Sequence, residues 1–185
     1  MIPQKEGRGG LIAIIADETS KSVARELYEK CLDANREAYY FCLEGMRIEP
    51  CYACRGCEEK TYGRCVTRDD ADKILPYVAR AKTVVIYTPI VCGGYSFRVK
   101  RLVDKFALIG DRHYYFRNGE LTKGAPSGFA YFVIGTFSGA NMEEAEAFKR
   151  LIKETLTLAS WAGRPIVMPR EADDYNAMTR EVSGA

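Results

Sequence analysis

The chain has 185 residues, which suits a single domain and is long enough to bury a sizeable core. Hydrophobic residues make up 47% and charged residues 28%, and the net charge of +2 gives no reason to expect nucleic acid or an acidic membrane surface as a partner. The apolar runs are too short to cross a bilayer, and the first residues lack the apolar segment of a secretory signal. We therefore expect a cytoplasmic protein whose cysteines stay reduced.

Short apolar runs alternate along the chain with segments of helical periodicity. Residues 11–16, 38–43, 83–88, 129–134 and 165–168 have the length and composition of buried strands. The alternation predicts an α/β fold in three layers, a five-stranded parallel sheet with helices on both faces. At this chain length the flavodoxin-like strand order 2-1-3-4-5 is expected.

The segments between these runs predict helices with recognisable ends. Pro76 shortens or kinks the helix before the third strand, Ser96 can cap the next helix, which ends near Gly110, and a long helix opens at Asn141 and closes at Gly163. The apolar residues of that long helix are Phe148, Leu151, Ile152, Thr155, Leu158 and Ala159. We expect one domain over residues 1–185, with a cysteine-rich loop insert at about 46–68 and a polar tail from about 170.

The loops that follow strands one, three and four are where a ligand is expected, because sheets of this type bind ligands at the carboxyl ends of their strands. In the first loop, Thr19 to Ser22 place three hydroxyls and Lys21 at the start of a helix, where a phosphate can bind. Taken alone, these residues are better explained as an ordinary helix cap, since almost every helix needs one, and the neighbouring Asp17 and Glu18 oppose a dianion. No dinucleotide fingerprint or P-loop sequence is present.

The other two loops are rich in glycine, hydroxyl and aromatic residues. Gly93 and Gly94 permit a positive φ or the close approach of a flat ligand, and Tyr95 can stack on one. The segment from Gly135 to Gly139 has the same character. Taken singly, each loop is as compatible with a plain turn, but together the three describe a site for a planar ring with a phosphate tail.

Four of the seven cysteines fall within one stretch, CYACRGCEEKTYGRC, as Cys51, Cys54, Cys57 and Cys65. Three thiols separated by two residues each, with a fourth nearby, suit an iron–sulfur cluster. Free or redox-active thiols and a zinc site are the alternatives, and the spacing leaves all three open. The surrounding cations do not decide among them, because positive charge stabilises a cluster and a thiolate alike.

The remaining cysteines and the single histidine are less informative. Cys31 and Cys42 fall on apolar stretches and are expected to be buried packing residues, and Cys92 lies in the second loop. His113 has no second histidine to work with, so a hydrolase is not indicated. No residue is assigned a catalytic role.

At this point the sequence resembles a known family. Residues 88–106, TPIVCGGYSFRVKRLVDKF, are similar to the Thr-Pro loop of flavodoxin-like, NADPH-dependent FMN reductases, and the C-x-x-C-x-x-C…C-x-x-x-D-D segment looks like the insert of their iron–sulfur flavoprotein branch. The resemblance runs from about residue 11 to 168. It implies FMN at the strand edge, NAD(P)H or a redox protein as electron donor, a homodimer or homotetramer, and a [4Fe–4S] cluster in the cysteine loop.

Carried over by position, the resemblance assigns two sets of residues. The FMN residues would be Thr19, Ser20, Lys21, Ser22, Thr88, Pro89, Ile90, Cys92, Gly93, Gly94, Tyr95, Gly135, Thr136, Phe137, Ser138 and Gly139. The metal ligands would be Cys51, Cys54, Cys57 and Cys65. The chain departs from the family pattern in three places: the G-S-P-R phosphate loop is missing, Val91 replaces a tyrosine, and Asp104-Lys105 replaces Asp-Arg.

The function expected from these features is a flavin-dependent NAD(P)H oxidoreductase that passes electrons to a quinone, a flavin, oxygen or a redox protein. A flavin carries this chemistry without a side-chain acid or base. Two alternatives remain at this level: an electron-transfer or redox-sensing module built on the cysteine loop, and a scaffold that has lost FMN.

Overall fold

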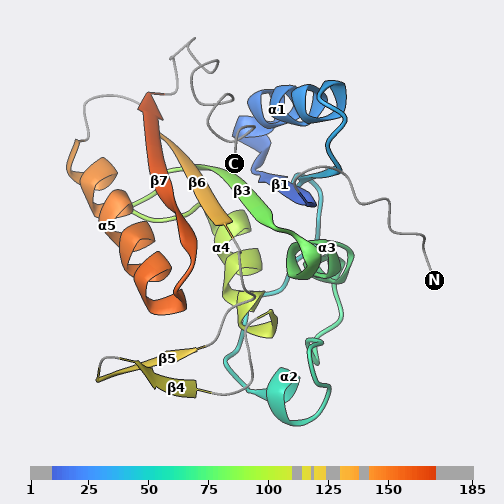
Figure 1. Cartoon of the computed structure of the whole chain (residues 1–185), viewed down its shortest axis with the longest axis vertical. Coiled ribbons are helices and arrows are strands. Elements are labelled where there is room, and N and C mark those ends of the chain that lie inside the picture. The colour runs from blue at the N-terminus through green and yellow to red at the C-terminus, as the bar shows by residue number, and fades with distance from the viewer. Residues whose placement is uncertain (1–9, 110–113, 118, 124–129, 138–141, 170–185) are drawn as a thin grey trace.

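The computed structural model describes residues 10–109, 114–117, 119–123, 130–137 and 142–169. Its centre is a five-stranded sheet with the order β2-β1-β3-β6-β7, in which all neighbours run parallel (Figure 1). The strands are β1 (Ile12–Ala16), β2 (Ala38–Cys42), β3 (Thr83–Pro89), β6 (Ala130–Phe137) and β7 (Ala162–Pro169). The predicted three-layer flavodoxin-like fold, with its 2-1-3-4-5 order, is confirmed.

Helices lie on both faces of this sheet. The α-helices are α1 (Lys21–Asp33), α2 (Gly56–Glu59), α3 (Leu75–Arg80), α4 (Phe97–Val103) and α5 (Met142–Ala159), and the 3-10 helices are η1 (Glu18–Ser20), η2 (Asp70–Lys73) and η3 (Asp104–Leu108). Helices α3, α4 and α5 contribute to the larger apolar cluster on one face, and α1 packs in the second cluster on the other. Among the described residues, no helix is long and apolar enough to cross a membrane.

The strand sequences divide between the two clusters as their pleat requires. Along β1, Ala13 and Ile15 belong to the larger cluster, while Ile12 and Ile14 belong to the second. All five residues of β1 are buried, because successive side chains point to opposite faces and both faces are covered. This is why the strand reads as a continuous apolar run.

The predicted cap of α4 and the predicted short helix at Pro76 are confirmed, whereas the predicted buried face of α5 is partly wrong. The Ser96 side chain accepts a hydrogen bond from the backbone of Val99 and caps α4. Helix α3 is short, with a proline in its first turn. Leu151 and Leu158 of α5, however, are 40% and 58% exposed, since the buried stripe runs along neighbouring positions instead.

The ends of β6 and α5 also differ from expectation. Gly135, Thr136 and Phe137, predicted as a loop, continue β6; Gly135 and Thr136 pair with both β3 and β7, and Phe137 pairs with β7. Helix α5 ends at Ala159, and Gly163 lies inside β7 with a φ of 126°, a backbone conformation that glycine adopts most easily. Strand β6 is longer than predicted because β3 and β7 supply pairing partners beyond its apolar run.

A second, antiparallel sheet of two strands was not anticipated. It consists of β4 (Tyr114–Arg117) and β5 (Glu120–Lys123). The turn residue Gly119 has a φ of 84°, as tight hairpins require. In the view of Figure 1, this hairpin and helix α2 of the cysteine-rich segment lie at the lower end of the molecule. Gly110, His113, Asn141 and the tail from residue 170 lie outside the described residues.

Candidate functional site

The sheet brings the three predicted ligand loops to one edge. Ala16 at the end of β1 pairs with Tyr87 of β3, and Thr88 pairs with Gly135 of β6. The segments that leave β1 and β3 therefore start side by side, with the last residues of β6 next to them. Of the predicted third segment, Ser138 and Gly139 lie outside the described residues. The edge where β1 meets β3 is the point at which sheets of this order bind ligands.

A buried polar network joins the loops of β1 and β3. The Asp17 carboxylate, only 2% exposed, accepts a hydrogen bond from the hydroxyl of Ser96. The guanidinium of Arg98, in the first turn of α4, lies 3.6 Å from Asp17 and 3.2 Å from the carboxylate of Glu18. The carboxylates of Asp17 and Glu18, which oppose a phosphate, are thus both paired with the guanidinium of Arg98, and that of Asp17 also accepts from the Ser96 hydroxyl.

The first loop offers one unpaired donor. Ser20 occupies the N-cap position of α1 but makes no capping hydrogen bond, and its hydroxyl is buried without a hydrogen-bond partner among the described residues. Thr19 and Ser22 are exposed. A buried, unpaired hydroxyl at a helix N-terminus is unfavourable unless a ligand accepts from it, and an anion is the ligand such a position favours.

Lys21, predicted as a phosphate contact, is engaged elsewhere. Its ammonium lies 2.7 Å from the carboxylate of Glu44, and this hydrogen bond raises the pKa of Lys21. Its backbone carbonyl accepts a hydrogen bond from the hydroxyl of Tyr40. The side chain is half exposed, and its charge is already paired with that of Glu44.

The loop after β3 is a tight, well-bonded turn. Val91 and Gly94 exchange two backbone hydrogen bonds of 3.0 and 2.9 Å, and the two residues between them, Cys92 and Gly93, have φ values of 49° and 71°. A turn with two positive φ angles in its centre is strained at Cys92, since side chains disfavour this conformation. The turn carries an exposed thiol at the strand edge.

Hydrogen bonds of Thr88 and Ile90 fix the start of this loop. The Thr88 hydroxyl is fully buried, accepts from the backbone of Ser96 and donates to the carbonyl of Pro89. The backbone of Ile90 donates to the carbonyl of Thr136 at 2.7 Å. Thr88 therefore shapes the loop through its own hydrogen bonds. Of the next two residues, Pro89 is half-buried and Ile90 is buried, with 9% of its surface exposed.

Two glycines allow the loops to pack closely on α5. A Cβ on Gly93 would lie 2.9 Å from the Cβ of Ala147, and one on Gly135 would lie 2.6 Å from a ring carbon of Phe148 and 2.8 Å from Ile90. Both distances are below van der Waals contact. The glycine signal read from the sequence is therefore explained at least in part by packing.

Tyr95 lies in the core and does not present its ring at the surface. Its hydroxyl is 3.1 Å from that of Tyr131 on β6, and its ring packs edge-on against Phe148. The side chain is 9% exposed, and burial raises the pKa of Tyr95 to about 12. The prediction that Tyr95 stacks on a ligand is wrong, because its ring packs against Phe148 of α5 in the core.

The cysteine loop presents four free thiols. Cys51 and Cys54 are exposed, and Cys57 and Cys65 are half-buried. Burial is the main cause that raises the pKa of Cys57, followed by the charges of Glu58 and then of Cys51 and Cys65, so the Cys57 thiol lies within electrostatic reach of both other thiols. Among the described residues, however, no three histidine, cysteine or acidic side chains are gathered closely enough to hold a metal ion.

The backbone of this loop is unusual. Ala53 and Arg55, on either side of Cys54, have φ values of 51° and 58°, and Tyr62 and Gly63 have 37° and 76°. A left-handed residue with a side chain costs roughly 1–2 kcal/mol, and such strain concentrates at functional sites. Alternating backbone of this kind turns successive N–H groups toward one point, which is how loops hold anions and iron–sulfur clusters.

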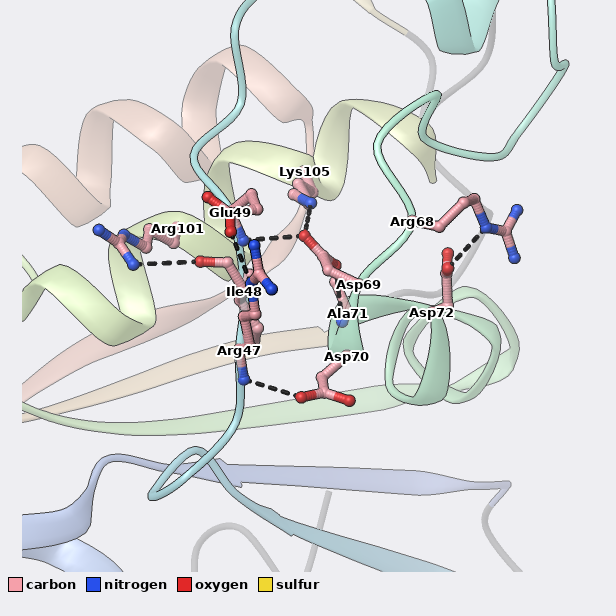
Figure 2. Close-up of polar contacts among 10 residues, drawn as sticks. All are labelled: Arg47, Ile48, Glu49, Arg68, Asp69, Asp70, Ala71, Asp72, Arg101 and Lys105. Atoms are coloured by element: carbon pink, nitrogen blue, oxygen red, sulfur yellow. Dashed lines mark hydrogen bonds and ion pairs between the residues drawn. The ribbon is translucent and has the colours of Figure 1, made fainter.

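The base of the cysteine loop is closed by the Asp-Asp pair that follows it (Figure 2). Asp69 accepts hydrogen bonds from the backbone of Glu49 and from the ammonium of Lys105, and Asp70 accepts from the backbone of Arg47 at 2.7 Å. The chain segments before and after the loop are thereby joined to each other and to η3.

Family membership follows from a comparison with family models. Residues 11–147 match the model of the NADPH-dependent FMN reductases. The chain belongs to this family. The match includes the β1 loop, the cysteine loop and the turn after β3, so the family resemblance read from the sequence is confirmed.

Curated relatives narrow the likeness to one branch of the family. An iron–sulfur flavoprotein of Methanocaldococcus jannaschii is 29% identical over 83 residues, 45% of this chain and 42% of that protein. One from Archaeoglobus fulgidus is 28% identical over 116 residues, 63% of this chain and 50% of that protein. The chain spans half or less of the length of these curated relatives.

Solved structures agree on the fold. An NAD(P)H:quinone oxidoreductase from Methanothermobacter marburgensis has a TM-score of 0.63 at 12% identity, with 95% of this chain and 92% of that chain covered. A putative quinone reductase from Klebsiella pneumoniae has a TM-score of 0.66 at 12% identity, covering 95% and 82%. At such identity the likeness establishes the architecture alone.

Sequence reasoning missed three of the residues that organise these sites. Arg98 lies inside the quoted segment 88–106 but was given no role, and only its position in the first turn of the helix after the second loop could have placed it near β1. Asp69 and Lys105 were noted as parts of motifs and given no role. No local signal marks them as buried, because Asp69 lies in the charged run RDDADK and Lys105 directly follows Asp104.

Proposed function

We propose that this protein is an FMN-dependent oxidoreductase that accepts electrons from NAD(P)H and passes them to a quinone, a flavin, oxygen or a redox protein. The observation that carries the proposal is the edge between β1 and β3, where an unpaired buried hydroxyl at a helix N-terminus faces the same edge as the strained turn after β3. Membership in the FMN reductase family supports it.

The residues present fit FMN. The hydroxyl of Ser20 and the N-terminus of α1 would hold the phosphate, with Arg98 as the nearby cation. The turn from Val91 to Gly94 would flank the ring. When bound, FMN supplies two-electron and one-electron transfer chemistry. The chain's own residues bind and orient it, and none of them needs to move a proton.

The network around Asp17 has a definite task in this proposal. By accepting from Ser96 and pairing with Arg98, the Asp17 carboxylate is held against the start of α4. Arg98 in turn offsets the charges of Asp17 and Glu18. The guanidinium contributed by α4 thus takes the place of the cation that the missing G-S-P-R loop would have supplied.

We propose further that the four cysteines hold a [4Fe–4S] cluster as a second redox group. Support comes from the four free thiols in one loop, from the left-handed backbone around Cys54, and from the iron–sulfur flavoproteins among the relatives. Because the thiols are not gathered in the described conformation, the side chains of the loop would have to turn inward when a cluster binds.

An absorption spectrum with iron, sulfide and zinc assays on anaerobically purified protein tests both parts. Flavin bands together with about four iron atoms per chain are the expected result. Flavin without iron would remove the cluster and keep the oxidoreductase. Absence of flavin, and failure to take it up when FMN is added, would refute the proposal. Cys57→Ser should abolish iron binding, whereas zinc held by the other three cysteines would persist.

A second candidate function is a thiol-based redox sensor, favoured by the exposure of Cys51 and Cys54. It predicts that mild oxidation links cysteines of the loop while NAD(P)H leaves the flavin spectrum unchanged. Rapid bleaching of the flavin by NAD(P)H decides for the enzyme. A cytoplasmic location and a homodimer or homotetramer belong to the proposal as well, and sedimentation analysis tests the assembly.

A further inference from the structure

A buried ion pair lies at the base of the cysteine loop. The side chains of Asp69 and Lys105 are 3% and 1% exposed, and the Lys105 ammonium donates to the Asp69 carboxylate. The same carboxylate accepts from the backbone of Glu49 at 2.8 Å and of Ala71 at 2.9 Å. One buried anion therefore organises three donors from three separate chain segments.

These donors sit on both sides of the cysteine loop. Glu49 comes just before Cys51, and Ala71 follows shortly after Cys65. Asp70 adds a second closure, because its carboxylate accepts from the backbone of Arg47 and its own backbone donates to the Arg47 carbonyl at 3.0 Å. The two chain segments that lead into and out of the loop are here called the stem (residues 47–50 and 66–71). These hydrogen bonds join the two segments to each other.

The stem is tied in turn to the helix that begins at the strand edge. Lys105 lies in η3, which continues α4, and α4 starts at the Ser96 cap that also binds Asp17. A second cation of the same helix, Arg101, donates to the carbonyl of Ile48 at 3.3 Å. Figure 2 shows both contacts: Arg101 reaches Ile48 and Lys105 reaches Asp69.

Stability alone does not account for such a pair. Removing two charges from water costs several kcal/mol, and apolar residues of similar volume often serve a core as well or better. A buried ion pair does, however, fix one geometry, because any other arrangement leaves a charge unpaired. Here the fixed geometry is that of the stem relative to α4.

We propose that Asp69 and Lys105 are positioning residues that hold the cysteine loop at a set place relative to the loop after β3. The functional meaning of this placement rests on the proposed function, in which the two loops carry the two redox groups. The placement itself is a property of the folded chain and needs neither group. Lys105 acts through Asp69 on the stem, and touches no cofactor in this proposal.

The test compares amide hydrogen exchange in three forms of the cofactor-free protein: wild type, Lys105→Met and Lys100→Met. Lys100 is the matched control, since it lies on the same helix and forms an exposed pair with Asp104. We expect Lys105→Met to speed exchange in peptides covering the stem by about tenfold or more, with β3 and β6 peptides within about threefold of wild type. The control should leave all of them unchanged.

A second variant decides the matter if Lys105→Met does not fold, as an unpaired buried charge can prevent. Asp69→Asn combined with Lys105→Met removes both charges together, and it should fold while its stem amides exchange faster. Lys105→Arg, which keeps the charge, should retain stem protection within about threefold. Wild-type stem protection in the folded double variant, or loss of protection in Lys105→Arg equal to that in Lys105→Met, would overturn the proposal.

Loaded protein provides the functional readout. In protein that holds both FMN and iron, Lys105→Met should slow electron transfer between the two groups by at least tenfold, while flavin reduction by NAD(P)H stays within about twofold. An unchanged rate between the groups would refute the positioning role. If wild-type protein takes up no iron, the cluster proposal fails, yet hydrogen exchange still decides whether the pair positions the stem.

Discussion

Replacing Arg98 by methionine removes the cation at the strand edge while keeping an unbranched, apolar side chain. Arg98 is 34% exposed and lies 3.2 Å from Glu18 and 3.6 Å from Asp17. If the phosphate of FMN binds at the N-terminus of α1, Arg98 is the cation paired with Glu18, two residues before Ser20, and its loss leaves two carboxylates without their cation. The variant should therefore weaken FMN binding.

The size of the effect follows from the kind of bond that is lost. A hydrogen bond to a charged group contributes about 1.5–3 kcal/mol, which corresponds to roughly a 10- to 150-fold rise in the dissociation constant. Because Arg98 is about a third exposed, solvent screens part of its charge, and the lower half of this range is expected. Raised ionic strength should narrow the difference between variant and wild type.

Fluorescence titration of the cofactor-free protein with FMN and with riboflavin measures this effect. Riboflavin lacks the phosphate, so its dissociation constant should change less than about threefold in Arg98→Met. Arg80→Met is the matched control, because Arg80 is an exposed arginine at the end of α3, just before the opposite end of β3. Equal loss of FMN and riboflavin binding, or no loss of either, would refute the assignment of Arg98 to the phosphate.

Further predictions concern the packing and the titration of the same region. Gly135→Ala would place a Cβ 2.6 Å from Phe148 and 2.8 Å from Ile90, and overpacking of this kind costs about 1–3 kcal/mol, or a drop in Tm of about 2–4 °C per kcal/mol for a chain of this size; a melt that matches wild type would contradict it. Burial raises the pKa of Tyr95 from 10.0 to about 12, so the folded state holds this proton more tightly and stability is complete below pH 10 and falls as the pH rises toward 12. Urea unfolding between pH 9.5 and 11.5 should show a shallower fall in Tyr95→Phe, and equal slopes would contradict the cause assigned. Ser20→Ala should raise or leave unchanged the stability of the cofactor-free protein, since it deletes an unpaired buried hydroxyl, while weakening FMN binding several-fold by the titration above.

The sequence predicts the sheet well because its strands are buried on both faces. Each of residues 12–16 is buried and apolar, so the run is visible without any knowledge of its partners. The end of β6 was missed for the opposite reason. Gly135 interrupts the apolar run and is a residue type depleted in strands, and the pairing of Gly135 and Thr136 with β3 and β7 is not visible in any local pattern.

Side-chain roles at the strand edge were harder to predict than backbone positions. Tyr95 was placed in the right turn, but its ring goes into the core because Tyr131 and Phe148 offer it a partner and a surface there. Lys21 was placed at the right helix start, and its charge is paired by Glu44, which is distant in sequence. In both cases the deciding neighbour comes from another strand or loop, and single-sequence patterns carry no information about such neighbours.

The helix formed by α4 and η3 connects what the sequence presented as separate motifs. Its first residues are bound to the β1 loop through Ser96 and Asp17, and its last residues are bound to the cysteine loop through Lys105 and Asp69. Both contacts are made by buried carboxylates, whose burial is tolerated only while the donors stay in place. A shift of this helix along its axis would therefore break hydrogen bonds at both ends together. The cysteine loop and the strand edge are for this reason parts of one rigid arrangement, in which a change at either site is opposed by the buried charge at the other.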